Sequence, residues 1–114
     1  LEVLCDLGVQ RVLTSGQANN AYDGRATIRA MVQQARGRII VMAGSGVRAD
    51  NAERLVEVTG VREIHLSASG SRDSRMAFRR DEVSMGAAKG VDEYSLRTTE
   101  EALVARVVAA LRDC

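Results

Sequence analysis

Hydrophobic positions along the chain fall into two patterns, short β-branched runs and longer stretches with helical spacing. The short runs are typical of buried strands, and they cover Val9 to Ser15, Arg38 to Ala43 and Val61 to Ala68. Between the first two runs, one helical stripe with spacing i, i+3, i+4, i+7 is formed by Ile28, Met31, Val32 and Ala35. The pattern predicts alternating strands and helices, which is the signature of an α/β fold.

Boundary residues predict three further helices. The chain opens inside a helix that Gly8 ends, because glycine takes the left-handed conformation at a helix C-terminus. Two capping-box patterns open the others, formed by Asp50 with Glu53 and by Thr98 with Glu101. Gly60 is expected to end the first of these. The second precedes an apolar stripe at Leu103, Val104, Val107, Val108 and Leu111.

Residues 69–97 show no sustained period and predict a long connection. Four arginines in it, Arg72, Arg75, Arg79 and Arg80, fit a solvated loop or a flap whose guanidinium groups meet an anion. Asp92, Glu93 and Tyr94 form an exposed acidic turn or a cation- or hydroxyl-binding corner.

An internal repeat favours one barrel architecture. Gly8–Gly16 aligns with Gly60–Ala68, 52 positions later, with one strand between them. Eight β-α units of half that length give about the 250 residues of a (β/α)8 barrel. We therefore predict that residues 1–114 form one partial domain, about three β-α units from the C-terminal part of a (β/α)8 TIM barrel, with no second domain. A complete three-stranded doubly wound domain is the alternative.

Charge and composition exclude several partners. Sixteen basic against 15 acidic residues give a net charge of +1, so no long-range field attracts nucleic acid or an acidic membrane. Apolar runs stop at five residues, far below the roughly 20 that span a bilayer. Cys5 and Cys114 stand in no CxxC or Cys/His cluster, which predicts no metal site here and favours the reducing cytoplasm. The composition is compatible with a homo-oligomer.

Candidate chemistry gathers where the predicted strands end. Such ends carry the functional residues of parallel α/β folds, and here they supply Ser15, Gly44, Ser45, Gly46, Ser67 and Ala68. Backbone N–H groups of a glycine-rich turn, together with a helix N-terminus, suit a phosphate or carboxylate. We predict a small anionic ligand at these residues. The alternative is that the glycines only permit a tight turn.

His65 and Glu63 share one face of the third predicted strand, because strand side chains alternate. With Ile64 and Leu66 under the helices, this polar face points into the barrel, where His65 and Glu63 are candidates for acid/base catalysis. The structural alternative makes His65 a hydrogen-bonded residue and pairs Glu63 with Arg11.

Several motifs in order resemble the CutC family. They are residues 11–17, 40–48 and 63–68, followed by Asp73-Ser74, Met76, Phe78-Arg79 and Asp92 to Ser95. The resemblance implies a cytoplasmic (β/α)8 barrel named for copper homeostasis, with this chain similar to its C-terminal half. It implies Cu(I) binding or trafficking, although the family's copper role is associated with cysteines of the N-terminal half, and no copper ligand is identified here.

Two main functions follow from these observations. The resemblance indicates copper homeostasis, whereas the strand-end residues indicate an enzyme acting on a small phosphorylated or carboxylated metabolite. A scaffold that works through oligomer contacts is a third hypothesis.

Overall fold

The computed structural model describes residues 1–80 and 94–112. Its elements are α1 (Glu2–Asp6), β1 (Arg11–Thr14), α2 (Arg25–Ala35), β2 (Ile40–Gly44), α3 (Ala52–Thr59), β3 (Glu63–His65), β4 (Ser69–Asp73), β5 (Ser95–Thr99) and α4 (Glu101–Leu111). Asp92, Glu93 and Cys114, which the sequence predictions include, lie outside the described residues. No helix of the described part is long and apolar enough to cross a membrane.

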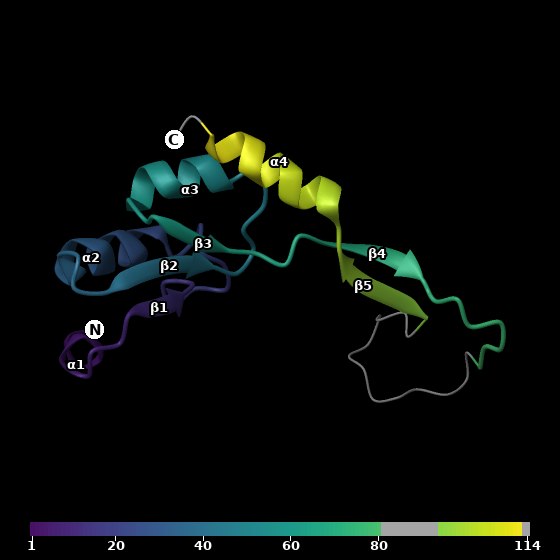
Figure 1. The fold of residues 1–114 in the computed structure, drawn as a ribbon, viewed down its shortest axis with the longest axis horizontal. Helices are drawn as coiled ribbons and strands as arrows, with labels where there is room; N and C mark the ends of the chain where they lie inside the picture. The colour runs from purple at the N-terminus through teal and green to yellow at the C-terminus, as the bar shows by residue number, and fades with distance from the viewer. Residues whose placement is uncertain (81–93, 113–114) are drawn as a thin grey trace.

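Three parallel strands in the order β1-β2-β3 form the first sheet. The helices α2 and α3 follow β1 and β2 and lie against one another (Figure 1). This arrangement of successive β-α units confirms the predicted α/β class. Each strand is shorter than predicted, because pairing begins only at Arg11, Ile40 and Glu63.

The two faces of this sheet have different surroundings. Val41 and Ala43 are buried in the core, and Val12 and Ile64 pack against it. The opposite face is open in the described structure: Leu13 is 54% exposed, and His65 is exposed beside it. A doubly wound sheet would carry helices on both faces, whereas a barrel sheet has helices on one face only. The open face therefore favours the barrel prediction over its alternative.

The core lies between the sheet and the inner faces of α2 and α3. Ile28 of α2 and Leu55 of α3 are fully buried, and burying a side chain of this size stabilises the fold by roughly 1.5–3 kcal/mol. Thr59 is buried as well, but its hydroxyl donates to the Leu55 carbonyl at 2.6 Å and accepts from the Val61 amide at 3.3 Å. The polar group is therefore satisfied within the core.

An ion pair ties α1 to the end of α2. Arg38 donates to both carboxylate oxygens of Glu2, at 2.7 and 2.9 Å, and Gln34 donates to Glu2 at 3.0 Å. These hydrogen bonds lower the pKa of Glu2 to about 2. Gly8 ends this first helical segment with a φ of 70°, as the sequence predicts.

Both predicted capping boxes are wrong. The N-cap of α3 is Asn51, and Asp50 instead pairs with Arg48. Thr98 lies in β5, so the N-cap of α4 is Glu100, whose amide donates to the Ala68 carbonyl at 2.9 Å. Strand pairing thus holds Thr98 extended, too early in the chain to cap α4. The glycine stop of α3 is confirmed, since Gly60 is left-handed with a φ of 76°.

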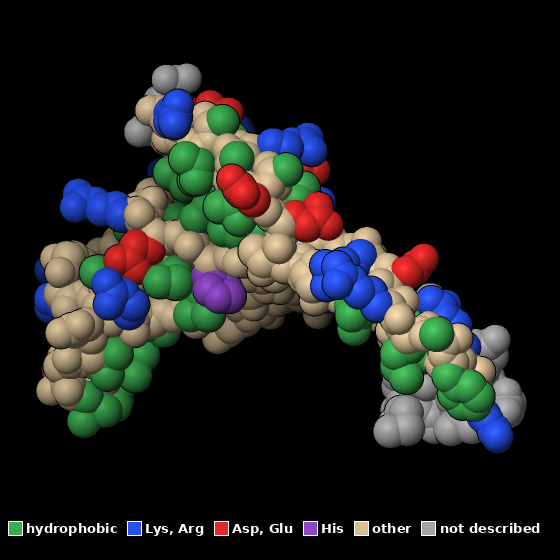
Figure 2. All heavy atoms as spheres, turned by 45° about the vertical axis from the view of Figure 1, so that its right-hand side comes forward, with side chains coloured by type: hydrophobic (Ala, Val, Ile, Leu, Met, Phe, Trp, Pro, Cys, Tyr) green, Lys and Arg blue, Asp and Glu red, His purple; other side chains and the backbone are tan. Residues whose placement is uncertain are grey.

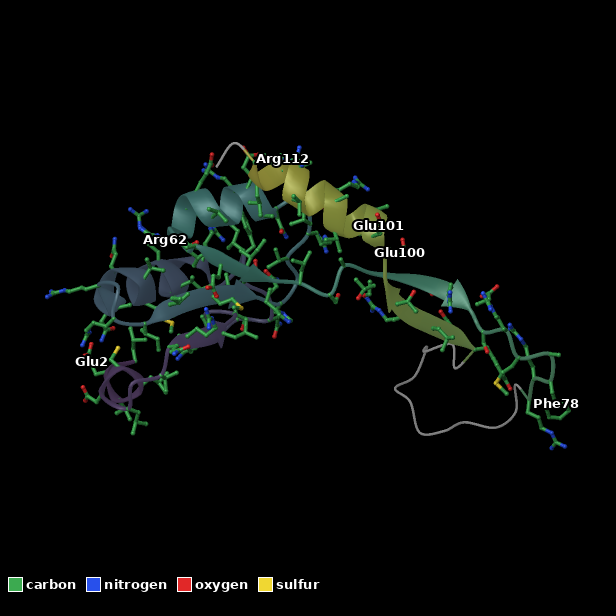
Figure 3. All side chains as sticks on the ribbon, viewed as in Figure 1. Glu2, Arg62, Phe78, Glu100, Glu101 and Arg112 are labelled. Atoms are coloured by element: carbon green, nitrogen blue, oxygen red, sulfur yellow. The ribbon has the colours of Figure 1, made fainter. Side chains whose placement is uncertain are left out.

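Residues 69–73 and 95–99 pair as the two strands of an antiparallel hairpin, where the sequence predicted a long connection. Strand β4 pairs with β5 from Ser69↔Thr99 to Asp73↔Ser95. The hairpin extends away from the parallel sheet (Figure 1), and Phe78 lies near its far tip, 70% exposed (Figure 3). Neither strand has a buried face, so the apolar/polar alternation that reveals a half-buried strand is missing.

Candidate functional site

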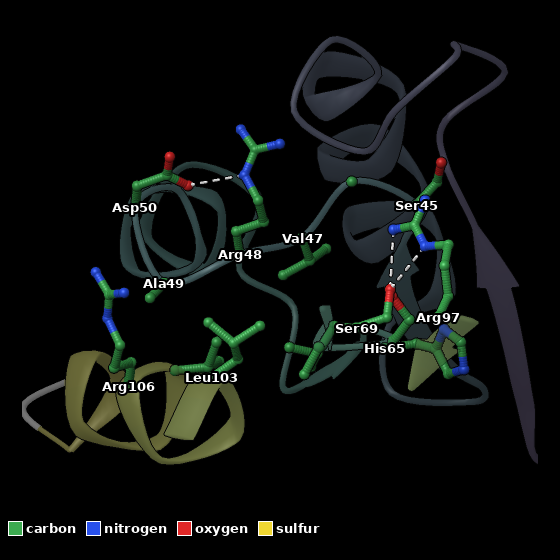
Figure 4. A pocket seen from close by; sticks show the side chains of 15 residues that line it. Ser45, Val47, Arg48, Ala49, Asp50, His65, Ser69, Arg97, Leu103 and Arg106 are labelled. Atoms are coloured by element: carbon green, nitrogen blue, oxygen red, sulfur yellow. Dashed lines mark hydrogen bonds and ion pairs between the residues drawn. The ribbon is translucent and has the colours of Figure 1, made fainter. Parts of the chain in front are cut away.

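A cavity of about 530 Å³ opens at the carboxyl ends of β2 and β3 (Figure 4). Three parts of the chain line it. They are the loop of residues 45–50, the residues 65–69 at the end of β3, and four side chains of β5 and α4, namely Arg97, Leu103, Arg106 and Val107. Five of the residues predicted from the sequence meet there: Ser45, Gly46, His65, Ser67 and Ala68.

The turn after β2 is held in an unusual conformation. Ser45 and Gly46 have φ values of 78° and 67°, and a side chain at such φ is strained. The Ser45 carbonyl accepts from the Ala21 amide at 3.0 Å, and its hydroxyl donates to the Asn19 carbonyl at 2.9 Å. The Asn51 side chain donates to the Gly46 carbonyl at 2.9 Å. No described acceptor takes the amides of Ser45 and Gly46, so both N–H groups stay available to a ligand.

The segment after β3 is anchored to β5 and α4. The carbonyl of Ser67 accepts from the Thr99 hydroxyl at 3.0 Å, and that of Ala68 accepts from the Glu100 amide at 2.9 Å. Ala68 is left-handed, with a φ of 44°. The hydroxyls of Ser67 and Ser69 lie 3.2 Å apart. These contacts bring the polar side chains of Ser67 and Ser69 to the cavity.

Three arginines that the sequence interpretation missed also line the cavity. Arg97 donates to the Ser69 hydroxyl at 2.9 and 3.3 Å, whereas Arg48 pairs with Asp50 at 3.3 Å. Arg106 lines the cavity from α4, together with Leu103 and Val107. Among the arginine and carboxylate side chains of the lining, three arginines against one aspartate give a net charge of +2. The sequence signal for Arg106 was its place beside the apolar stripe of α4.

The arginines of the predicted flap do not line this cavity. Arg79 lies over the Tyr94 ring at 4.9 Å, and Arg80 lies over the Phe78 ring at 5.9 Å. These contacts stay within the hairpin segment and its far end. The anion-binding role predicted for a flap is therefore not supported by the described geometry.

Ser15 and Gly44 also lie outside the cavity. The Ser15 hydroxyl donates to the Ala18 carbonyl at 2.7 Å within the loop after β1. Gly44 lies at the end of β2, where an added Cβ would come within 2.6 Å of a Leu13 methyl group and 3.3 Å of the His65 Cβ. Its lack of a side chain thus serves sheet packing.

Glu63 is engaged in an ion pair. Arg11 donates Nε to Oε2 and Nη2 to Oε1, both at 3.0 Å, which is the pairing that the structural alternative predicts. These hydrogen bonds hold the pKa of the Glu63 carboxyl below its usual value. Glu63 is absent from the cavity lining, whereas His65 reaches it from the same face of the sheet. The chain's one histidine is exposed (purple in Figure 2).

Similarity to known proteins extends over nearly the whole chain. A model of the CutC family matches residues 1–70. The chain belongs to the CutC family. This finding confirms the resemblance drawn from the motifs, and the family fold confirms the TIM-barrel class.

The similar CutC proteins are longer than this chain. A copper homeostasis protein cutC homolog of Mus musculus is 44% identical over 99% of this chain and 42% of its own length. Its counterpart from Homo sapiens is 46% identical over 88% of this chain and 37% of its own length. The crystal structure of a CutC protein from Streptococcus agalactiae is 35% identical, with a TM-score of 0.53, over 56% of this chain and 31% of that one. The chain thus spans less than half the length of these relatives.

Metal-ligating side chains in this part of a CutC protein are scattered. The described residues contain no group of three or more His, Cys, Asp or Glu side chains that could hold a metal ion. Cys5 lies in α1, and His65 lies at the end of β3, an edge strand of the parallel sheet. Cu(I) prefers clustered thiolate and thioether ligands, so the residues described here do not fit a copper site.

Proposed function

We propose that this CutC chain binds a small phosphorylated or carboxylated metabolite at the carboxyl ends of β2 and β3. The observation that carries the proposal is the lining of the cavity, in which three arginines meet one aspartate beside the Ser45–Gly46 turn. Backbone N–H groups and guanidinium groups are the usual protein donors to phosphate and carboxylate oxygens. The position also matches the phosphate sites that barrel enzymes build from the loops after their last two strands.

The arrangement assigns a separate part to each group. Arg97 is held by Ser69, so its planar fork is ordered before a ligand arrives. The amides of Ser45 and Gly46 would donate hydrogen bonds to the anion without bringing a competing charge. His65 lies in the same lining, where its imidazole would give a proton to the bound metabolite or take one from it.

Titration with inorganic phosphate tests this function. Because His65 is the chain's one histidine, its Cε1–H nuclear magnetic resonance signal reports directly on the cavity. We expect phosphate to shift this signal saturably, and Arg97→Leu to weaken binding by about 10-fold or more, as loss of a charged hydrogen bond does. Arg79→Leu is the matched control, because it removes the same charge from outside the cavity. An unchanged His65 signal, or equal losses in both variants, would refute the site.

Copper homeostasis is the second candidate, and the names of the mouse and human relatives support it. We propose that it is a role of the whole cytoplasmic protein, with Cu(I) ligands outside the residues described here. A Cu(I) competition titration of this chain should show only the weak binding of scattered sulfur ligands. Tight stoichiometric binding that Cys5→Ser abolishes would contradict this assignment.

A further inference from the structure

The cavity at the ends of β2 and β3 has two polar ends with an apolar strip between them. Figure 4 shows Arg97 at one side of the cavity, with Ser45, His65 and Ser69, and Arg48, Asp50 and Arg106 at the other. Val47 and Leu103 lie between the two groups (Figure 4). We name the two sides the Arg97 end and the Arg106 end.

At the Arg97 end, every described lining group is neutral or basic. Arg97 donates from Nε and one Nη to the Ser69 hydroxyl. Its remaining N–H groups can donate to another acceptor. The available amides of Ser45 and Gly46 lie on the same part of the lining. A doubly charged phosphoryl group would therefore meet donors there and no carboxylate.

The Arg106 end has the same net charge of +1, but it contains a carboxylate, that of Asp50. Arg48 and Asp50 neutralise one another in a pair whose side chains are 71% and 69% exposed. Arg106 makes no hydrogen bond or ion pair with a described residue, which leaves one unmatched positive charge. A single carboxylate balances that charge, whereas a doubly charged group would be repelled by Asp50.

The strip between the two ends is apolar and largely buried. Val47 is 6% exposed and Val107 is 5% exposed, and Leu103 and Leu66 complete this part of the lining. A ligand that covers the strip must be apolar there, because an unpaired polar group in such surroundings loses its hydrogen bonds to water. Methylene groups, in contrast, are stabilised when an apolar surface removes them from water.

We propose that the cavity selects an elongated metabolite with an anionic group at each end of an apolar spacer. Its phosphoryl group binds at the Arg97 end, its carboxylate binds Arg106, and its spacer covers Val47 and Leu103. The proposal rests on the anion-binding function proposed above and names the class of ligand. It separates the roles of two arginines that a simple phosphate site would treat alike.

Two matched ligands test the proposal on the 114-residue chain. The probe 6-phosphonohexanoate carries both anionic groups, whereas hexylphosphonate has a methyl group in place of the carboxylate. Calorimetry with these two compounds and with inorganic phosphate measures each contribution separately. We expect 6-phosphonohexanoate to bind about 10-fold tighter than hexylphosphonate, since one charged hydrogen bond is added.

Variants then assign the two ends. Arg106→Leu should abolish the preference for 6-phosphonohexanoate while leaving hexylphosphonate binding unchanged, and Arg97→Leu should weaken both. Arg62→Leu is the matched control, because Arg62 lies outside the cavity (Figure 3). Equal binding of the two probes, or a preference that survives Arg106→Leu, would overturn the two-ended ligand and leave the phosphate site standing. Failure of all three compounds to bind would overturn the anion-binding function itself.

Discussion

The parallel sheet with its helices and the β4–β5 hairpin are stabilised in different ways. Of the eleven buried apolar side chains in the described structure, ten lie between Ala21 and Val61, and the other is Val107 of α4. In the hairpin segment, Met76, Phe78 and Leu96 are 60%, 70% and 44% exposed. The hairpin therefore depends on its backbone ladder and on polar side-chain contacts, each of which contributes only about 0.5–1.5 kcal/mol net.

The cavity lies where these two regions meet. The well-packed region supplies the Ser45–Gly46 turn, whereas the hairpin supplies Arg97, which is held by its hydrogen bond to the Ser69 hydroxyl. One part of the site is thus held by a core and the other by exposed hydrogen bonds. This difference predicts that binding of an anion would order the hairpin more than the turn.

The strongest test of the comparison truncates one leucine in each region. Leu55→Ala removes a side chain that is 1% exposed and should lower the free energy of unfolding by about 2–5 kcal/mol. Leu96→Ala removes one that is 44% exposed and should change it by no more than about 0.5 kcal/mol. Urea unfolding followed by circular dichroism measures both. Comparable losses in the two variants would show that the hairpin shares the core's cooperativity.

The region with a core was also the predictable one. Ile28 and Ala35 are buried on the inner face of α2, with Met31 and Val32 packed beside them, as their spacing predicts. The hairpin strands SGSRD and SLRTT lack a buried face, so no periodicity marked them. Because neither strand is buried, their pairing is determined by backbone hydrogen bonds. These bonds involve every residue type alike and so leave no pattern in the sequence.

The residues of the candidate site also divide into those that the sequence could predict and those that it could not. Ser45, Gly46, Ser67 and Ala68 could be predicted because the ends of adjacent parallel strands meet at one edge. Arg97 and Arg106 could not, because a residue of β5 or α4 reaches the cavity only through tertiary packing. Local charge density favoured the arginines of residues 72–80, but their described contacts lie within the hairpin segment.

A second test places the same small change in both regions. Gly16→Ala puts a Cβ at a φ of 70° and 2.2 Å from the Gly24 carbonyl oxygen, which belongs to the backbone. Gly70→Ala puts one 1.5 Å from a Glu100 carboxylate oxygen, the movable end of a side chain. We expect Gly16→Ala to cost at least about 2 kcal/mol, because strained φ alone costs about 1–3 kcal/mol, and Gly70→Ala to cost less than about 1 kcal/mol.

Denaturant midpoints of the two glycine variants decide the outcome. A small loss of stability in Gly16→Ala would mean that the loop after β1 can move away from Gly24, so that this loop is no more constrained than the hairpin. A large loss of stability in Gly70→Ala would mean that the Glu100 carboxylate is held in place. Either result would narrow the difference between the two regions.

The smallest expected effect lies on the open face of the parallel sheet, at the Arg11–Glu63 pair. Because Arg11 lowers the pKa of Glu63 in the folded chain, folding favours the ionised carboxylate relative to the unfolded state, whose pKa is about 4.3. The pair therefore stabilises the fold fully above that value. Its contribution is lost as the pH falls through the lower folded-state pKa.

Glu63→Gln should accordingly be less stable than the parent chain at neutral pH, and the difference should close on acidification. Urea midpoints measured across this pH range follow the gap directly. In an Arg11→Gln background the same substitution should open no such gap, since the partner that lowers the pKa of Glu63 is gone. A gap that persists at the acid end, or that survives Arg11→Gln, would mean that Glu63 stabilises the sheet through packing. In that case the open face would resemble the helix-covered face more closely than its exposed ion pair indicates.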